Sequence, residues 1–141
     1  MRSPHPLHWS VAAAVALGGA VGATLRYALT LGFPDAPDGF PWTVFAINVL
    51  GCFALALLPG FTAVRRRPLL PPLLGTGVLG GFTTLSTYAE QSRALLASGR
   101  DELAAAYVIG TLTACLLAVL VADRFSTVTA RREFDDEEGD L

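Results

Sequence analysis

The chain has 141 residues, of which 52% are hydrophobic and 16% are charged, and its mean hydropathy is +0.51. A soluble domain carries about 25% charged residues, so the deficit of charge indicates a protein that lies in lipid. Six of the 12 acidic residues fall in the last nine positions, and without them ten Arg face six acids, a net charge of +4. We therefore expect residues 1–125 to form one membrane domain and residues 126–141 to form an acidic, disordered tail.

Four apolar stretches follow one another along the chain, at residues 7–30, 43–64, 69–96 and 103–122. About 20 apolar residues in a helix cross the ~30 Å of hydrocarbon in a bilayer. The connectors combine turn-forming residues with charge and read as loops. The sequence therefore predicts an all-α, multi-pass protein of the plasma membrane with four transmembrane helices. A signal peptide is the alternative for the first stretch, but its apolar run exceeds the usual length.

The first stretch is rich in small residues, and Gly18 and Gly22 form a GxxxG pair. In lipid, helices associate through close packing, so small residues mark a packed face. That face can lie against another helix of the same chain or against a second chain. The sequence leaves both alternatives open.

The third stretch contains four glycines, at positions 75, 77, 80 and 81, and then a run of Thr and Ser within 83–87. This composition forms a continuous helix poorly, which favours a helix broken near the midplane of the membrane. A broken helix presents free carbonyls that attract cations and free amides that attract anions. The alternative is a flexible glycine-rich helix whose hydroxyls bond to their own backbone.

Two polar residues lie in or beside the first two stretches. Asn48 is near the centre of the second stretch, and an amide in hydrocarbon must face protein or water. Its alternative role is a simple link between helices. Arg26 closes the first stretch, where it could extend toward the lipid headgroups. No Asp or Glu lies deep in the first, second or fourth stretch, which argues against a proton-coupled cation exporter.

Three segments together resemble the Fluc (CrcB-type) fluoride channels: GAVGATLRY at 19–27, NVLG at 48–51 and GGFTTLSTY at 80–88. The resemblance covers about residues 8–122 in the order of that family, and the third segment is its most specific part. It implies a dimer of antiparallel four-helix subunits with pores along the subunit interface. The expected partners are fluoride, membrane lipid and a second subunit, identical or related, and no nucleic acid.

The resemblance also assigns roles to individual residues. A structural sodium ion, the expected cofactor, would be held by the backbone carbonyls of Gly80 and Thr83. Arg26 would keep the electrostatic field of the pore positive. The expected pore and anion-binding residues are Asn48, Leu85, Ser86, Thr87, Tyr88, Tyr107, Thr111 and Cys115. Fluoride is strongly hydrated, and amide and hydroxyl donors or the positive edges of aromatic rings can replace its water.

The chain departs from the family's pattern at two positions. Leu85 and Tyr88 stand where the family usually has Phe, and Leu has no ring edge to offer an anion. Phe82 is an alternative source of a ring, although it is offset along the helix. Cys115 stands where the family has Ser, and a thiol is a weaker donor than a hydroxyl. Two alternatives follow: the chain conducts with an altered aromatic box, or a different subunit supplies the missing ring.

Taken together, these features predict a fluoride-specific channel subunit that lowers cytoplasmic fluoride by passive export. We find no nucleophile–base pair, metal-ligand set or phosphate loop, so no enzymatic activity is expected. The alternatives are a small four-span cation or drug exporter and a non-conducting partner subunit of a heterodimeric channel. Seven Arg against three on the two sides of the expected topology place the termini in the cytoplasm.

Overall fold

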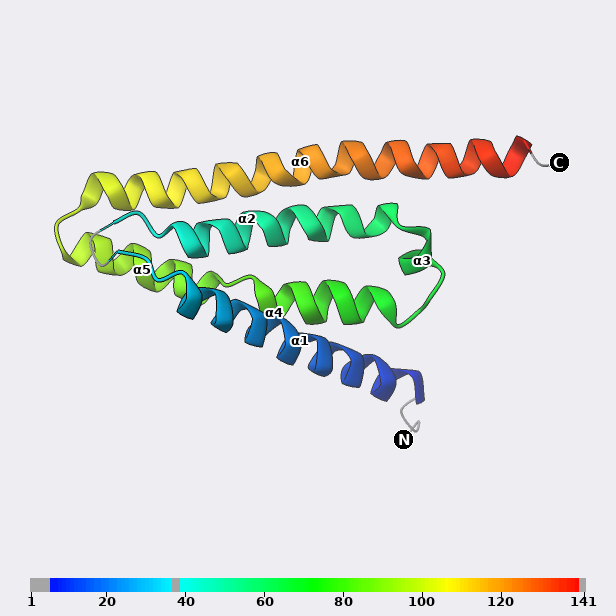
Figure 1. Ribbon diagram of the computed structural model, residues 1–141, viewed down its shortest axis with the longest axis horizontal. Helices are drawn as coiled ribbons and strands as arrows, with labels where there is room; N and C mark the ends of the chain where they lie inside the picture. Colours follow the sequence, from blue (N-terminus) through cyan, green and yellow to red (C-terminus); the bar gives the residue numbers. More distant parts are fainter. Residues whose placement is uncertain (1–5, 37–38, 140–141) are drawn as a thin grey trace, which may run out of the picture.

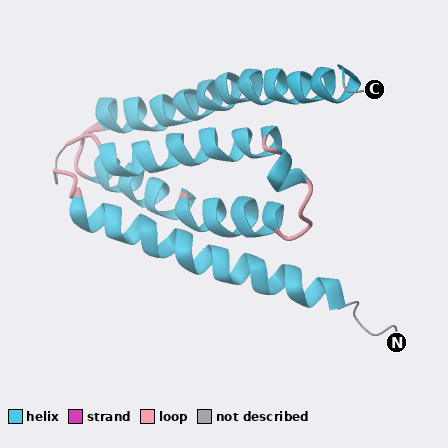
Figure 2. Cartoon of the chain, turned by 45° about the vertical axis from the view of Figure 1, so that its right-hand side comes forward, coloured by secondary structure: helices cyan, strands magenta, loops and turns pink. Residues whose placement is uncertain are grey.

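The computed structural model describes the backbone of residues 6–36 and 39–139 and the side chains of residues 9–36 and 39–126. Within this part the chain forms helices and no strand (Figures 1 and 2), so the all-α prediction is confirmed. The elements in chain order are α1 (Pro6–Gly32), α2 (Trp42–Leu57), η1 (Leu58–Gly60), α3 (Thr62–Arg65), η2 (Pro72–Leu79), α4 (Gly80–Phe82), α5 (Leu85–Ala97) and α6 (Asp101–Gly139).

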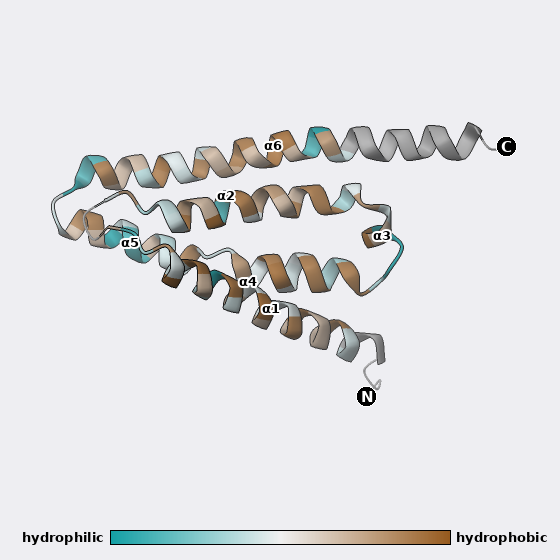
Figure 3. Ribbon diagram, viewed as in Figure 1, coloured by the Kyte–Doolittle hydropathy of each residue, from teal (hydrophilic) through white to brown (hydrophobic). Residues whose placement is uncertain are grey.

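Three segments of the described chain are long and apolar enough to cross a membrane: Trp9–Gly32, Trp42–Gly60 and Asp101–Ser126. The expected third span is instead divided among η2, α4 and α5, which follow one another beside α1 and α2 in Figure 1. The chain is therefore a multi-pass membrane protein. Figure 3 shows the apolar residues spread along these helices and hydrophilic residues in the connections between them.

The second helix is shorter than the sequence predicted. We expected it to reach residue 64, but α2 ends at Leu57 and is followed by the short helix η1. Pro59 lacks a backbone N–H, and Phe61 is extended with φ −93° and ψ 115°. The chain then turns through α3 before it re-enters the bundle at η2.

The glycines of α1 pack against η2 and α4 of the same chain. A side chain at Gly18 would collide with the Leu73 carbonyl, and one at Gly22 would collide with the Val78 carbonyl. From the opposite side, Gly81 leaves room for the backbone of α1 at Gly19. Of the two alternatives for the GxxxG pair, the structure shows packing within one chain, and the two backbones approach because no Cβ separates them.

The helices α2 and α6 pack together and enclose the most buried side chains. Val44 and Ile47 of α2 are almost fully buried, and Tyr107 of α6 is fully buried. The loop before α2 is anchored by Asp35, whose Oδ1 accepts the Thr43 N–H at 2.9 Å. The interface of α2 and α6 therefore forms a rigid support for polar side chains placed along it.

The last helix continues beyond the boundary expected at residue 125. The backbone of α6 is helical through Gly139, while the side chains of residues 127–141 lie outside the described part. The disorder expected of the acidic tail stays a prediction.

Candidate functional site

The candidate site is built around an interruption of the third apolar stretch. The helix α4 ends at Phe82, and the next two residues are extended, with φ −74° and ψ 157° at Thr83 and φ −147° and ψ 117° at Thr84. Helix α5 begins directly afterwards, at Leu85. The break expected from the glycines and threonines therefore lies at Thr83 and Thr84.

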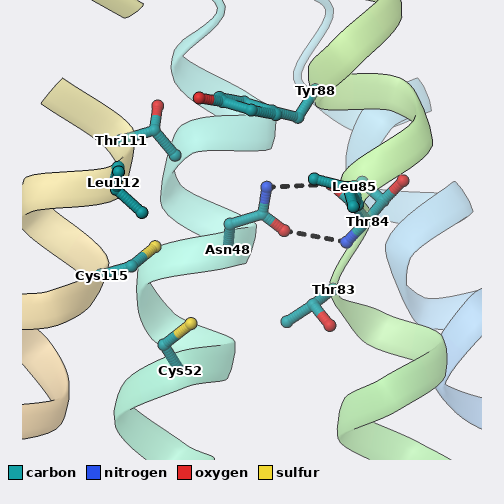
Figure 4. Close-up of a pocket in the computed structure, with 9 residues that line it drawn as sticks. All are labelled: Asn48, Cys52, Thr83, Thr84, Leu85, Tyr88, Thr111, Leu112 and Cys115. Carbon is teal, nitrogen blue, oxygen red and sulfur yellow. Dashed lines mark hydrogen bonds between the residues drawn. The ribbon is translucent and has the colours of Figure 1, made fainter. Parts of the chain in front are cut away.

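Asn48 of α2 stabilises this extended backbone. Its Oδ1 accepts the Thr84 N–H at 2.8 Å, and its Nδ2 donates to the Thr84 carbonyl at 3.1 Å (Figure 4). Both groups would otherwise be buried without a partner, at a cost of about 1–3 kcal/mol each. Asn48 thus links two helices, the alternative role considered for it, and does so through the backbone of the break.

The break changes the hydrogen bonding of two carbonyls. In an unbroken helix, the Gly80 carbonyl would accept the Thr84 N–H and the Thr83 carbonyl would accept the Thr87 N–H. Here the Thr84 N–H donates to Asn48 Oδ1, and the Thr87 N–H donates to Thr84 Oγ1 at 3.1 Å. These two carbonyls are the pair for which the sequence predicted a cation.

The hydroxyls after the break form a cap at the start of α5. Thr84 Oγ1 donates to Thr87 Oγ1 at 3.0 Å, so in its 3.2 Å contact with Ser86 Oγ it must accept. The Ser86 proton is therefore used within the cap, whereas the Thr87 hydroxyl acts here as an acceptor. This cap fixes the direction in which the N-terminus of α5 points.

Arg26 of α1 bonds to the backbone of α4. Its Nε donates to the Gly81 carbonyl at 3.2 Å. The guanidinium thus lies at the C-terminal end of α4, where the helix dipole favours a positive charge. The role expected for Arg26, to keep the field near the break positive, stays a prediction.

A cavity of about 240 Å³ lies between the break and helices α2 and α6. Its lining consists of Asn48, Cys52, Thr83, Thr84, Leu85, Tyr88, Thr111, Leu112 and Cys115 (Figure 4). This lining includes no Asp, Glu, Lys or Arg. The cavity is therefore walled by apolar groups with a few neutral polar atoms.

Thr111 is the unusual polar residue of this cavity. It is 4% exposed, and its Oγ1 has no hydrogen-bond partner among the described residues. A threonine in a helix usually satisfies its hydroxyl by bonding to its own backbone, as Thr24 does with the Ala20 carbonyl at 2.8 Å. A buried hydroxyl without a partner needs an explanation, and a water or ligand bound in the cavity would provide one.

The sequence matches a known family over the part that forms this site. The CrcB-like protein, Camphor Resistance (CrcB) family matches residues 13–122. The chain belongs to the CrcB-like family. It is 49% identical to fluoride-specific ion channel FluC 1 of Streptomyces coelicolor, over 79% of this chain and 74% of the relative. It is 43% identical to FluC 2 of Nocardia farcinica over 90% and 94%, and 40% identical to FluC of Paramagnetospirillum magneticum over 84% and 97%.

The structure brings together six of the residues predicted from the CrcB-like resemblance. The cavity is lined by Asn48, Thr83, Leu85, Tyr88, Thr111 and Cys115. The remaining predicted residues, Arg26, Gly80, Ser86, Thr87 and Tyr107, lie outside its lining. Phe82, considered above as a source of a ring, is buried and does not line it either.

The two tyrosines of the expected site already have hydrogen-bond partners. The Tyr88 hydroxyl donates to the Val108 carbonyl at 3.0 Å, and the Tyr107 hydroxyl donates to Gln91 Oε1 at 2.8 Å. Tyr107 also packs edge-on against Phe40, with ring centroids 5.3 Å apart. In this chain Tyr107 therefore supports the wall behind the cavity, and Tyr88 presents its ring to the cavity.

Three lining residues were not predicted: Cys52, Thr84 and Leu112. Cys52 follows Asn48 by four residues and so shares its helix face, which is the sequence signal that could have found it. Thr84 belongs to the segment 80–88 that resembles the family. It bonds to Asn48 through its backbone, and only the folded structure shows this contact.

Proposed function

We propose that this chain is a subunit of a fluoride-specific channel that exports the anion passively. The observation that carries the proposal is the buried, unpartnered hydroxyl of Thr111 in a cavity that also contains Asn48. The relatives described above carry the name of fluoride-specific ion channels, which supports the same function.

The cavity offers donors suited to a small anion. The Nδ2 group of Asn48 carries two hydrogens, of which one goes to the Thr84 carbonyl and the other is available for a ligand. The Thr111 hydroxyl supplies a further donor. Because no carboxylate lines the cavity, the anion meets no like charge there. Donors without fixed negative charge replace part of the water that fluoride loses.

The break adds a positive field near these donors. The N-terminus of α5 carries the positive end of its helix dipole, and it begins at Leu85 in the cavity wall. Arg26, bonded to the Gly81 carbonyl, adds a full charge close to the break. Both favour an anion over a cation in the cavity.

The carbonyls of Gly80 and Thr83 fit the proposed structural sodium ion. The N–H groups that would bond to them in a continuous helix, those of Thr84 and Thr87, donate to other acceptors. Carbonyl oxygens at an unwound helix are suitable ligands for sodium in membranes. A bound sodium would contribute one fixed positive charge at the break. Arg26, which donates to the neighbouring Gly81 carbonyl, would then be a second positive charge close to the ion.

We infer that a second chain completes the cavity. Leu85 is 78% exposed and Leu112 is 61% exposed, so the polar lining opens to the outside of the subunit beside them. Lipid cannot satisfy the Thr111 hydroxyl or the Asn48 amide. We therefore place an antiparallel second subunit over this face, either an identical copy or a related chain that supplies the aromatic ring absent at Leu85.

Fluoride efflux from liposomes that contain only the purified chain tests this proposal. We expect fluoride to leave and chloride to be retained under the same gradient. Thr111→Val should slow the efflux, while Thr113→Val, on an exposed face of the same helix, should not. Equal fluoride and chloride rates, or equal rates in the two variants, would contradict the proposed site. Efflux that appears only with a related chain would establish the heterodimer.

A further inference from the structure

Two thiols face each other in the wall of the cavity. Cys52 of α2 and Cys115 of α6 both line it, and Figure 4 shows the two thiols at neighbouring positions of its wall, on two different helices. The helices that carry them, α2 and α6, pack against each other. Neither forms a disulfide, and the sequence contains no further cysteine.

The register of the two helices makes this pairing part of the cavity. Cys52 follows Asn48 by four residues, and Cys115 follows Thr111 by four residues. Residues four apart lie on the same helix face, one turn further along. The thiols therefore form a second level of the wall, next to the polar level formed by Asn48 and Thr111.

The surroundings restrict what this pair can bind. Within the described residues, no group of three or more His, Cys, Asp or Glu side chains is placed to hold a metal, so the protein offers two sulfurs. Zinc takes four ligands, and calcium and magnesium take oxygen ligands, whereas soft cations prefer thiolates. Because no charged side chain lines the cavity, a complex without net charge is favoured.

We propose that Cys52 and Cys115 together bind one soft, two-coordinate cation of the Cu(I), Ag(I) or Hg(II) class. Hg²⁺ would displace both thiol protons to solvent and form two Hg–S bonds, which gives a neutral complex. A monovalent cation would displace one proton and be held by one thiolate and one thiol, again neutral. No atom changes its oxidation state. The inference does not depend on fluoride transport.

Binding of this kind would connect α2 to α6 across the cavity. The metal would lie one helix turn from the Asn48 and Thr111 donors and would occupy part of the ~240 Å³. The expected consequence is a narrower and more rigid cavity. A soft metal is thus expected to be an inhibitor of whatever passes through this site.

One equivalent of Hg²⁺ added to the purified full-length chain without reductant or oxygen tests the site. We expect the intact mass of a single chain to rise by one mercury less two hydrogens. Both cysteines should then be protected from a maleimide, and two protons should be released per chain. In Cys52→Ser and in Cys115→Ser, one proton should be released, and competing glutathione should remove the mercury about 100-fold faster, because the second ligand is lost.

Three results would overturn the inference. If one equivalent leaves one cysteine per chain reactive, or if the chain takes up two mercury ions, the thiols bind independently. If the mercury is recovered in a species of twice the chain mass, the metal connects two chains and not two helices. Equal release by glutathione from the unaltered chain and from both single variants would contradict it as well.

Discussion

Asn48 and Thr84, 36 residues apart in sequence, are joined by two hydrogen bonds that satisfy both backbone groups of the extended residue. Without Asn48, the Thr84 N–H and carbonyl would be buried in a membrane-spanning protein with no partner. Because the Thr84 N–H donates to Asn48, it does not donate to the Gly80 carbonyl as it would in a continuous helix. One side chain of α2 therefore both stabilises the break and determines which carbonyl the break leaves available.

The first prediction concerns Asn48→Asp. The carboxylate can still accept the Thr84 N–H, but it cannot donate to the Thr84 carbonyl and adds a negative charge to the cavity. We expect the free energy of unfolding to fall by about 1–3 kcal/mol and fluoride efflux to be lost. Thermal unfolding in detergent and growth on fluoride of cells lacking their own exporter measure the two effects. Growth equal to that given by the unaltered chain would contradict the role of Asn48 in the pore.

The second prediction separates stability from transport at Thr111. Because the Thr111 hydroxyl is buried without a partner, Thr111→Val removes an unsatisfied group and keeps the shape of the side chain. We expect the free energy of unfolding to stay constant or to rise by up to about 1 kcal/mol. Fluoride efflux should nevertheless fall at least about tenfold, since one donor worth about 1.4 kcal/mol or more is lost from the anion's path.

The control for Thr111→Val is Thr113→Val, because Thr113 is exposed on the same helix. Thr113→Val should change neither the free energy of unfolding nor the rate of fluoride efflux. A large loss of stability in Thr111→Val would show that the hydroxyl has a structural partner and would remove the main support for the anion site.

Much of the fold could be predicted from local features of the sequence. Long apolar stretches define α1, α2 and α6, and the glycines and threonines of residues 75–87 locate the break. The need to satisfy an amide in hydrocarbon also predicted correctly that Asn48 faces protein. These features depend on the composition of continuous segments of the chain, which a single sequence displays.

Other features depend on how the helices are rotated against one another, which local composition does not specify. The hydrogen bond from Arg26 to the Gly81 carbonyl and the position of Cys52 and Cys115 in one cavity wall are of this kind. The glycines also show that local composition does not predict which residues pack against another helix. Gly80 and Gly81 are adjacent in sequence, but a Cβ at Gly80 would lie 3.8 Å from the nearest atom, whereas Gly81 faces α1.

The third prediction uses these neighbouring glycines as a matched pair. A methyl group at Gly81 would collide with the Gly19 carbonyl of α1, so Gly81→Ala should destabilise the chain by several kcal/mol or prevent folding. Gly80→Ala meets only ordinary contacts and should be neutral or stabilising by up to about 1 kcal/mol. Thermal unfolding of both variants measures the difference. Similar behaviour of the two would contradict the packing of α1 against α4.

The fourth prediction concerns the proposed sodium ion. If the Gly80 and Thr83 carbonyls bind it, exchange of sodium for a large organic cation at constant ionic strength should lower the melting temperature. Thr83→Ser keeps the carbonyl and should retain this dependence. Asn48→Ala should weaken it, because the Thr84 amide is then free to return to the Gly80 carbonyl. A melting temperature that does not depend on the cation would count against the site.

The last prediction concerns orientation in the membrane. In Figure 1 the start of α1, the loop around α3 and the end of α6 lie at one end of the molecule, as an even number of passes requires. The arginines of that end, by sequence, are Arg2, Arg65, Arg66, Arg67, Arg124, Arg131 and Arg132. The opposite end was assigned Arg26, Arg93 and Arg100, but Arg26 binds the Gly81 carbonyl inside the bundle. The balance is therefore seven against two, and positively charged loops remain in the cytoplasm.

We accordingly expect most copies to have both termini in the cytoplasm. An antiparallel dimer would then need a related subunit of opposite orientation, which could also supply the ring absent at Leu85. Reporters fused to the C-terminus, one active only inside the cell and one only outside, measure the orientation. As a control, replacing the three arginines of residues 65–67 by Gln should shift the signal toward the outside reporter, because it removes the densest group of positive charge. Comparable signals from both reporters on the unaltered chain, together with fluoride efflux by this chain alone, would establish a homodimer and contradict the heterodimer.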